Sequence, residues 1–529
     1  MIRSILSRLP RIPWFPAALA FALIFAITVA FQRESGAFQS EMGAEPDEAA
    51  HYVTGLMMRD YVAAGCPGNP LAFAKKYYEH YPKVALGHWP PGFYVAQTLW
   101  TLPFGPGRAS ILVFMAALTG ALGSLLFLIL RRDLGNLWAI TGAVILAMLP
   151  LTYQHAGMVM TEIPIALLVL LGAFFYGLYL EREQPLDSVL YGVIAAAALL
   201  TKFSALSLAF VPVIGILLTR KFHLLRKASF WAPVAIVLMT VGPWTAFTLK
   251  LAKDGMMEEK PSVAFLLHAL KYFSLKLTSG ASWIIIVFAA AGVFASFRKN
   301  GKAVAGRHAA LVALPVGVIV LHAAVPAGLE ARHLVPALAA VIYFAIFGAD
   351  FVTRKVAQFG PPGGAQKFIC FLLLGIGLVH ALPVKPKGYA GFEPVAMELL
   401  NEAAVGKVRA LVVSDARGEG MLVSEAAVRD RKRTLEIKRA SKLLAESNWN
   451  GGAYTARAAN TAEAVRLLKT EGIQYVVIDR TIPERLKKTH HEVLSMAVGD
   501  TQFFTEKSRH EITRAGRTLQ DGILVYTVK

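Results

Sequence analysis

The sequence predicts an all-α polytopic membrane bundle of about eleven transmembrane helices, followed by a small α/β domain. The residues are 55% hydrophobic and 17% charged, whereas soluble domains are near 45–50% apolar and a quarter charged. Apolar runs long enough to cross the hydrocarbon core recur along residues 1–383. After Pro383 the composition changes to short strand-like and helix-like segments, which predicts a separate domain at 384–529.

The apolar runs define the expected transmembrane helices. They lie near 14–31, 109–130, 134–152, 163–180, 187–201, 203–219, 229–250, 281–297, 308–327, 334–352 and 367–383, the fifth being the weakest. The first run also resembles a signal peptide, because basic residues precede an apolar stretch. No clear small-residue cleavage site follows it and it is long enough to span, so we interpret it as the first helix.

Basic residues between the runs predict the orientation in the membrane. They occupy every second gap: Arg3, Arg8 and Arg11, then Arg131-Arg132, Arg182, Arg220-Lys221 with Arg226-Lys227, Arg298-Lys299 through Arg307, and Arg354-Lys355. Cytoplasmic loops carry such an excess, so the N-terminus is expected inside and, after an odd number of crossings, the C-terminal domain outside. The net charge of +19 therefore reflects loop positions and does not indicate a nucleic-acid partner.

Cellular context can be inferred only indirectly. The compact external domain, with no eukaryotic targeting signal, predicts a bacterial inner membrane. Cys66 and Cys370 match no metal-ligand spacing and are too few for a disulfide framework, although one bridge between them stays open.

The gaps expected outside the membrane differ greatly in length. The first, 32–108, contains helix-like stretches at 46–64 and 71–81 and is therefore expected to be a structured module. The fourth, 251–280, is long and mixed. No repeat of loop lengths or motifs relates the two halves, whereas many transporters show internal repeats. A lipid or solute transporter or flippase nevertheless stays open as the alternative function.

The C-terminal domain has the pattern of a small α/β fold. Val408–Val413 and Gln474–Ile478 read as buried strands, and Gly522–Val528 as a closing strand. Thr461–Thr470 has the spacing of an amphipathic helix.

Ionisable residues are nearly absent from the interior of the runs. His322 and His380 are the only candidates there, and both lie near the predicted outer ends of their runs. Ionisable residues gather instead at the expected outer boundary: Glu45, Asp47, Glu48, His51, His88, His155, Glu162, Lys202, Glu330, Arg332 and His333. Ionisable residues deep in a transmembrane helix are costly and usually functional, so an ion-coupled transporter should show some near the midplane. The pattern predicts a polar site at the external interface, assembled from loops far apart in sequence.

Several of these residues have a plain structural interpretation as well. Asp47 and Glu48 follow Pro46 at a helix start, where carboxylates complement the positive helix end. Asp47 and His51 are four positions apart and share a face, whereas Glu48 points about 100° away. Glu162 likewise precedes a helix.

The other boundary residues leave similar alternatives. The stretch from His88 to Tyr94 is expected to enter the second transmembrane helix, either as an aromatic belt with a rigid Pro-Pro turn or as part of a pocket. Lys202 lies in a short turn on the side where positive charge is disfavoured, which indicates a phosphate partner or snorkelling. Arg332 could pair locally with Glu330.

These motifs, in this order, resemble the membrane-embedded GT-C glycosyltransferases, particularly the family 39-like group of protein O-mannosyltransferases and lipid A aminoarabinose transferases. The motifs are Glu45-Pro46-Asp47-Glu48-Ala49-Ala50-His51, His88-Trp89-Pro90-Pro91-Gly92-Phe93-Tyr94, Thr161-Glu162-Ile163-Pro164, Thr201-Lys202-Phe203-Ser204 and Glu330-Ala331-Arg332-His333-Leu334-Val335-Pro336. In the last, His333 stands where a tyrosine is commoner. The resemblance covers about 1–383.

The resemblance implies transfer of a sugar from a polyprenyl-phosphate donor to an acceptor outside the cytoplasm, usually with inversion. Asp47 is then the expected base, with Glu162 orienting a substrate. Further roles follow for supporting residues Glu48 and His51, for donor-phosphate residues Lys202, Arg332 and His333, and for pocket residues His88 and Tyr94. No metal cofactor is expected, although a divalent ion stays open. The sugar and the acceptor, whether protein, lipid or glycan, are not readable.

Overall fold

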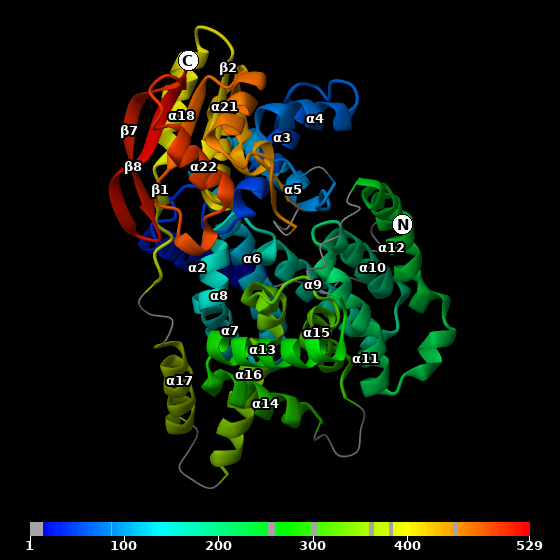
Figure 1. The fold of residues 1–529 in the computed structure, drawn as a ribbon. Coiled ribbons are helices and arrows are strands. Elements are labelled where there is room, and N and C mark those ends of the chain that lie inside the picture. The colour runs from blue at the N-terminus through cyan, green and yellow to red at the C-terminus, as the bar shows by residue number, and fades with distance from the viewer. Residues whose placement is uncertain are drawn as a thin grey trace.

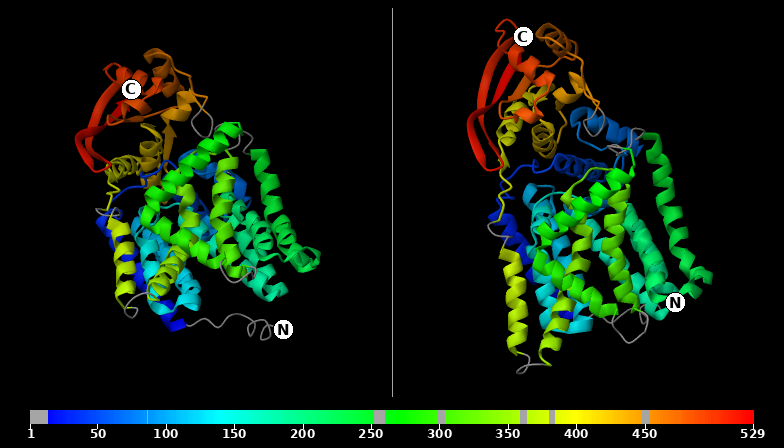
Figure 2. Two further views of the ribbon diagram at one scale, coloured as in Figure 1. Left: turned by 90° about the horizontal axis from the view of Figure 1, so that it is seen from below. Right: turned by 60° about the horizontal axis from the view of Figure 1, so that its bottom comes forward.

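A computed structural model describes residues 14–85, 87–251, 260–297, 304–358, 364–379, 384–447 and 453–529. The basic residues Arg3, Arg8, Arg11, Arg298 and Lys299 lie outside the described residues, as do His380 and the end of the run predicted at 367–383. Within the described residues the helical bundle forms one end of the molecule and the C-terminal domain the other (Figures 1 and 2).

Six helices in the described part of the chain are long and apolar enough to cross a membrane. They are α2 (Trp14–Glu34), α6 (Arg108–Leu134), α9 (Glu162–Arg182), α12 (Ala228–Leu251), α15 (Gly306–Ala324) and α16 (Val335–Val356). Shorter apolar helices are α10 (Pro185–Leu199), α11 (Phe210–Thr219) after the 3-10 helix η1 (Phe203–Ala209), and α17 (Gly364–Leu378). Each of the eleven predicted runs contains a helix, which confirms the predicted fold class.

Two bent helix pairs raise the number of candidate spans to eight. Helices α7 (Asn136–Met148) and α8 (Pro150–Ala156) meet at 66°, where Pro150 cannot continue the hydrogen-bond ladder. Helices α13 (Val263–Ala281) and α14 (Trp283–Phe297) meet at 107°. Helix α14 matches the predicted run at 281–297, whereas α13 forms a long helix in the gap that reads as mixed.

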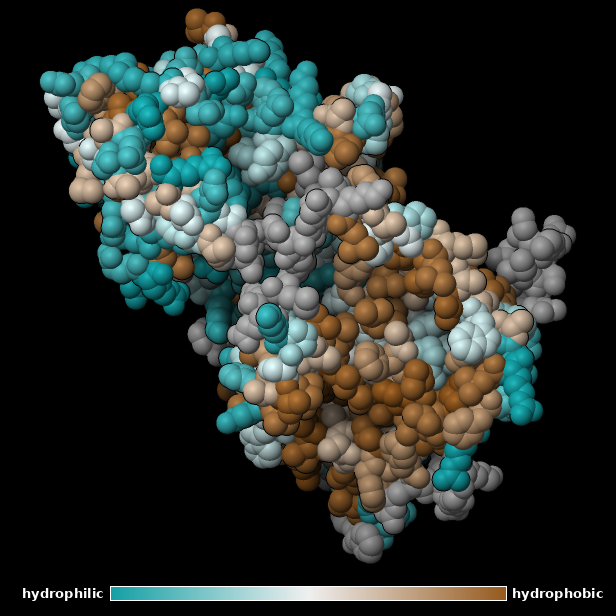
Figure 3. Space-filling model, turned by 45° about the vertical axis from the view of Figure 1, so that its right-hand side comes forward, coloured by the Kyte–Doolittle hydropathy of each residue, from teal (hydrophilic) through white to brown (hydrophobic). Residues whose placement is uncertain are grey.

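Glycines let the bundle pack closely. A Cβ on Gly292 of α14 would lie 2.0 Å from the Phe344 carbonyl oxygen, and one on Gly348 of α16 would lie 1.9 Å from the Phe288 oxygen. Small residues at such crossings allow helix backbones to touch, which gives tight packing without a hydrophobic driving force. On the face seen in Figure 3, hydrophobic residues predominate over the bundle and hydrophilic ones over the C-terminal domain. The chain is a multi-pass membrane protein.

The segment between α2 and α6 contains three helices, of which two are predicted. Helices α3 (Glu48–Ala63) and α4 (Pro70–His80) confirm the helix-like stretches. The prediction that residues 88–94 enter the second transmembrane helix is wrong. They lead into a separate helix, α5 (Gly92–Phe104), which ends at Gly105 before α6 begins at Arg108. The apolar residues of α5 and α6 look continuous in the sequence, but the glycines and prolines at 103–107 end one helix before the next begins.

The C-terminal domain is built on a six-stranded sheet of order β1-β7-β8-β6-β2-β3. Its strands are β1 (Tyr389–Ala390), β2 (Val408–Val413), β3 (Leu435–Arg439), β6 (Tyr475–Asp479), β7 (Phe504–Arg514) and β8 (Arg517–Val528). Strand β2 runs parallel to β3 and β6, and the hairpin β7–β8 closes the sheet antiparallel. The helices are α18 (Phe392–Ala403), α19 (Ala416–Arg429), α20 (Ala440–Leu443), α21 (Thr461–Thr470) and α22 (Thr489–Ala497). The predicted strands and helix are confirmed.

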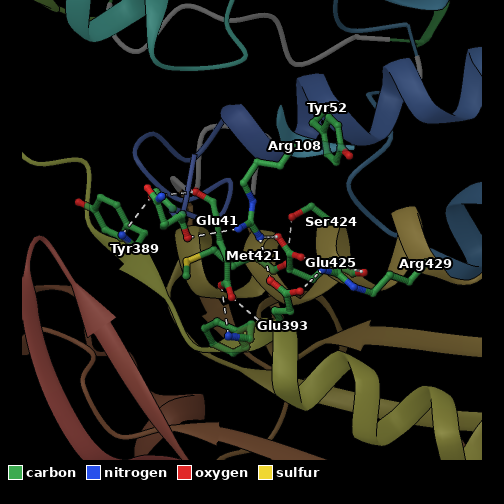
Figure 4. A network of polar contacts seen from close by, with 12 residues as sticks. Glu41, Tyr52, Arg108, Tyr389, Glu393, Met421, Ser424, Glu425 and Arg429 are labelled. Carbon is green, nitrogen blue, oxygen red and sulfur yellow. Dashed lines mark hydrogen bonds and ion pairs between the residues drawn. The ribbon is translucent and has the colours of Figure 1, made fainter. Parts of the chain in front are cut away.

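This domain docks on the segment between α2 and α6, and on the start of α6, through mostly buried charges (Figure 4). Arg108 Nη2 lies 2.8 Å from Glu425 Oε1 of α19 and 3.3 Å from Glu393 Oε2 of α18. Glu41 accepts hydrogen bonds from the backbone amides of residues 391–393 at the start of α18. Burial raises the pKa of Glu41 to about 7. The apolar core continues through this contact, because Phe392 belongs to the same buried cluster as the bundle.

Candidate active site

Asp47 and Arg332 form the centre of the polar site. Asp47 precedes α3 as its N-cap residue, yet its side chain makes no capping hydrogen bond. Its Oδ2 atom instead lies 3.2 Å from Arg332 Nη2, in the 3-10 helix η3 (Ala331–Leu334) that precedes α16. The Asp47 side chain keeps 34% of its surface exposed, whereas Arg332 keeps 16%. Asp47 is therefore an accessible carboxylate held beside a buried cation.

Glu162 and Lys202 form a second ion pair beside the first. Lys202 Nζ donates to Glu162 Oε1 at 2.6 Å, and Arg332 Nε lies 3.9 Å from the same oxygen. Glu162 is the first residue of α9, and its side chain is 2% exposed. Arg332 also pairs with Glu330, as the local alternative predicts. The two cations and the carboxylates Asp47 and Glu162 thus occupy one site, although four loops supply them.

Aromatic side chains enclose His51, one turn along α3 from Asp47. His51 Nδ1 lies 2.9 Å from the Tyr94 hydroxyl oxygen, and its ring stacks on Trp89 with centroids 4.0 Å apart. Burial lowers the pKa of His51 to about 4, against the opposing charge of Asp47. The imidazole is therefore neutral at neutral pH. His88, half-buried, begins the turn that carries Trp89.

The turn at 88–92 packs directly against the turn that carries Lys202. The Gly92 amide donates to the Leu200 carbonyl oxygen at 2.6 Å. A Cβ on Gly92 would lie 2.7 Å from that oxygen and 2.9 Å from Thr201 Oγ1, so only glycine fits there without displacing its neighbours. Two of the sequence motifs therefore meet through their backbones, and Trp89 contributes to the site rather than only to an interfacial belt.

His333 lies beside Arg332 but faces a different neighbour. Its ring stacks on His322 of α15 at a centroid distance of 4.4 Å, and Phe273 of α13 lies 6.3 Å away. Its Nδ1 atom is buried without a hydrogen-bond partner. The histidine pair places two further imidazoles at the cationic side of the site.

Glu48 points away from Asp47, as the helical spacing predicts. Its side chain is fully buried, and Oε1 lies 2.5 Å from Nζ of Lys387, in the segment that joins the bundle to the C-terminal domain. The carboxylate also accepts hydrogen bonds from the backbone amides of Ala44 and Val159. All of these contacts are structural, so Glu48 has no free oxygen directed at the site.

Two residues at the contact with the C-terminal domain were missed by sequence reasoning. Arg417 of α19 lies 3.6 Å from Glu45, and burial raises the pKa of Glu45 despite that cation. Lys83 is buried and donates to the carbonyl oxygens of Pro46, at 3.3 Å, and Ala416, at 3.0 Å. Nothing in the sequence marks Lys83, Arg417 or Lys387, since lone basic residues outside the apolar runs are ordinary.

Among the described residues, no group of three or more His, Cys, Asp or Glu side chains is placed to hold a metal ion. Metal independence stays a prediction.

A bundle of apolar helices, a helical segment between α2 and α6, and a carboxylate–cation site at the ends of α3, α9 and α16 make up one fold. This is the architecture that the sequence resemblance predicts. Residues 88–247 match the family model described as dolichyl-phosphate-mannose-protein mannosyltransferase. No curated protein matches the chain.

Solved structures share the fold across nearly the whole chain. ArnT from Cupriavidus metallidurans bound to undecaprenyl phosphate is 12% identical, with a TM-score of 0.58 over 96% of this chain and 97% of that one. The structure of the same ArnT in the apo state gives a TM-score of 0.59, over 96% of this chain and 98% of that one. The archaeal oligosaccharyltransferase AglB from Archaeoglobus fulgidus, in complex with an inhibitory peptide and a dolichol-phosphate, is 11% identical, with a TM-score of 0.51 over 88% and 69%.

Proposed function

We propose that this protein is a glycosyltransferase that moves a sugar, a hexose or a pentose, from a polyprenyl-phosphate donor to an acceptor. The observation that carries the proposal is the accessible Asp47 carboxylate beside Arg332, with Lys202 behind it. The match at 88–247 and the shared fold with ArnT and AglB support it. The ArnT and AglB structures hold undecaprenyl phosphate and a dolichol-phosphate, respectively.

The chemistry requires a base at the acceptor and cations at the leaving group. Asp47 takes the proton of the acceptor hydroxyl as its oxygen bonds to the anomeric carbon. The bond from that carbon to the donor phosphate oxygen breaks at the same time, and the phosphate leaves with the electron pair. Attack opposite the leaving group inverts the anomeric centre. A carboxylate base typically contributes about 10²–10⁴-fold.

Arg332 and Lys202 stabilise the leaving phosphate, whose negative charge grows in the transition state. Before the donor arrives, Asp47 and Glu162 neutralise these cations. Glu162, with its buried contact to Lys202, acts here as the counterion that keeps the lysine in place. His51 and His333 can donate hydrogen bonds, and Trp89, Tyr94 and His88 line the acceptor side of the site.

The position of the site suits a lipid-linked donor. Glu162 and Arg332 lie at the ends of the spanning helices α9 and α16, so an isoprenoid tail stays in the hydrocarbon while its phosphate meets the cations. We place this end of the bundle on the extracytoplasmic side of a bacterial inner membrane, with the N-terminus cytoplasmic, from the distribution of basic loops.

A transfer assay tests the proposal. Membranes containing the protein are incubated with undecaprenyl-phosphate sugars radiolabelled in a hexose or a pentose, and label is followed into lipid, protein and polysaccharide fractions. We expect protein-dependent loss of label from one donor and its appearance in one fraction. Mass spectrometry of glycans and lipids from a deletion strain then identifies the acceptor. If no donor loses label, and undecaprenyl phosphate does not bind, the proposed activity is wrong.

A further inference from the structure

Lys387 contacts three segments of the chain that surround the proposed site. Its Nζ atom lies 2.5 Å from Glu48 Oε1 and donates to the Gly157 carbonyl oxygen at 3.1 Å. Its backbone amide donates to the Ser35 oxygen at 2.8 Å, at the end of α2. Lys387 is 7% exposed and Glu48 is fully buried. One lysine therefore joins the first helix, the start of α3 and the loop before α9.

The two loops joined in this way carry the two acidic residues of the site. Glu48 is the residue after Asp47 and, besides Lys387, accepts the amide of Val159 at 3.2 Å. Val159 and Gly157 lie in the short loop that ends at Glu162, the first residue of α9. The Glu48–Lys387 pair therefore fixes the backbone beside Asp47 relative to the backbone that leads to Glu162.

A second contact holds the other flank of Asp47. Lys83 donates to the Pro46 carbonyl oxygen and also to the Ala416 oxygen at the start of α19. In the same region a Cβ on Gly420 of α19 would lie 2.8 Å from the Cβ of Ala49. Both flanks of Asp47 thus connect to the part of the chain after residue 384.

The pair is buried where its desolvation has a large cost. Removing two charges from water costs several kcal/mol per ion, and a well-packed apolar pair of similar volume is often as stable. A buried pair with three backbone contacts is therefore better explained by the geometry it fixes than by the stability it adds. Misplacement of a reacting group by about 1 Å can cost about 10²-fold in rate.

From these contacts we infer that Lys387 is a positioning residue, which through Glu48 and Gly157 holds the Asp47 and Glu162 loops in register. The inference rests on the proposed function for the role of the two carboxylates. It goes beyond that function because it makes the segment entering the C-terminal domain part of the machinery that aligns the membrane-embedded site.

The test compares three variants in the full-length protein. Lys387→Met removes the cation and leaves the buried Glu48 carboxylate without a counterion. Lys387→Met combined with Glu48→Gln removes both charges, so it separates loss of register from the cost of an unpaired buried charge. Lys385→Met is the matched control, because Lys385 lies two positions away in the same segment and is exposed.

Two readouts are measured on the purified proteins. Hydrogen exchange with mass spectrometry follows peptides that contain the Ala44 and Val159 amides. Transfer kinetics use the undecaprenyl-phosphate sugar that the wild-type protein accepts. We expect faster exchange at both loops in the single and double variants, and a kcat about 10- to 100-fold lower with the donor KM within about 3-fold. Lys385→Met should match the wild type in both readouts.

Each outcome decides between the possibilities. We expect the double variant to be more thermally stable than Lys387→Met, because it has no unpaired buried charge. If its kcat nevertheless stays low, the positioning role is supported. A double variant with wild-type kcat, or unchanged exchange at both loops, overturns the inference. Wild-type protein that transfers no sugar overturns the proposed function instead, and exchange at the Ala44 and Val159 amides still shows whether Lys387 joins the loops.

Discussion

Arg332 Nη2 lies 3.2 Å from Asp47 Oδ2, although 285 positions separate the two residues in the chain. The contact joins the N-terminus of α3, in the segment between α2 and α6, to the turn before α16, in the second half of the bundle. The carboxylate that we propose as the base and the guanidinium that we propose for the donor phosphate are thereby neighbours. In the proposed reaction, one member of this ion pair removes the acceptor proton and the other stabilises the leaving phosphate.

Replacing the proposed base should remove activity without removing donor binding. Asp47→Asn keeps the size of the side chain and its contact with Arg332 but cannot take a proton. We expect transfer to fall by about 10²–10⁴-fold, with undecaprenyl phosphate still raising the Tm as in the wild type. Transfer kinetics and thermal unfolding measure the two effects. Full activity in Asp47→Asn would rule out its role as base.

The contact between the turns at 88–92 and 200–202 can be tested through Gly92. A Cβ there would lie 2.7 Å from the Leu200 carbonyl oxygen, so Gly92→Ala must separate the turns. We expect a loss of about 1–3 kcal/mol in the free energy of unfolding, as for other overpacked sites. Gly242→Ala is the control, since nothing lies within 4 Å of a Cβ at that helical position. Equal Tm values for the two variants would contradict the close contact.

Much of the fold is readable from sequence because the bilayer demands long apolar helices. The runs predicted at 109–130 and 163–180 match α6 and α9 closely, and Val408–Val413 is found as a strand with the predicted bounds. Helix α5 is missed because its apolar pattern continues toward α6 across Pro106. Hydrophobicity alone does not show that a helix lies in a loop, since α5 packs against α3 through contacts distant in sequence.

The sequence predicts which residues form the candidate site, but it does not predict which of them contact one another. Position relative to the apolar runs places Asp47, Lys202 and Arg332 at one boundary, because charges are costly within the runs and are nearly absent there. Pairing depends on helix rotation and loop shape, which no local pattern encodes. Lys387 shows the limit, since nothing in its Pro-containing segment indicates that the lysine is buried against Glu48 and Gly157.

The buried His51 should make stability depend on pH. Its pKa is about 4 in the folded protein and about 6.5 in an unfolded chain, so the fold excludes the charged imidazole. The stability from this difference is present above pH 6.5 and is lost as the pH falls toward 4, by at most about 1.4 kcal/mol per pH unit. His51→Gln should flatten the Tm decline across this window, measured in detergent. An identical slope in both proteins would show that His51 charges freely.

Arg108 should control docking of the C-terminal domain. Arg108→Met leaves Glu425, whose side chain is 5% exposed, without one of its two cations, since Arg429 alone still pairs with it. Loss of one partner of a buried pair typically costs about 3–5 kcal/mol. We expect limited proteolysis to release the C-terminal domain faster. Arg59→Met, which breaks the half-buried Arg59–Asp60 pair, serves as the control and should behave like wild type.

Lys202 should contribute to the affinity for the donor phosphate. Its ammonium lies 2.6 Å from Glu162, and in Lys202→Gln that buried carboxylate keeps only Arg332, at 3.9 Å, as a counterion. Phosphate then meets one fewer cation and a less compensated anion, so we expect undecaprenyl phosphate to bind about 10- to 100-fold more weakly, by about 1.4–2.8 kcal/mol. The Tm increase with added undecaprenyl phosphate measures the affinity. The double variant Lys202→Gln/Glu162→Gln separates the two effects, because it removes the carboxylate as well and should recover part of the binding. An unchanged affinity in Lys202→Gln would assign the lysine to snorkelling rather than to the donor.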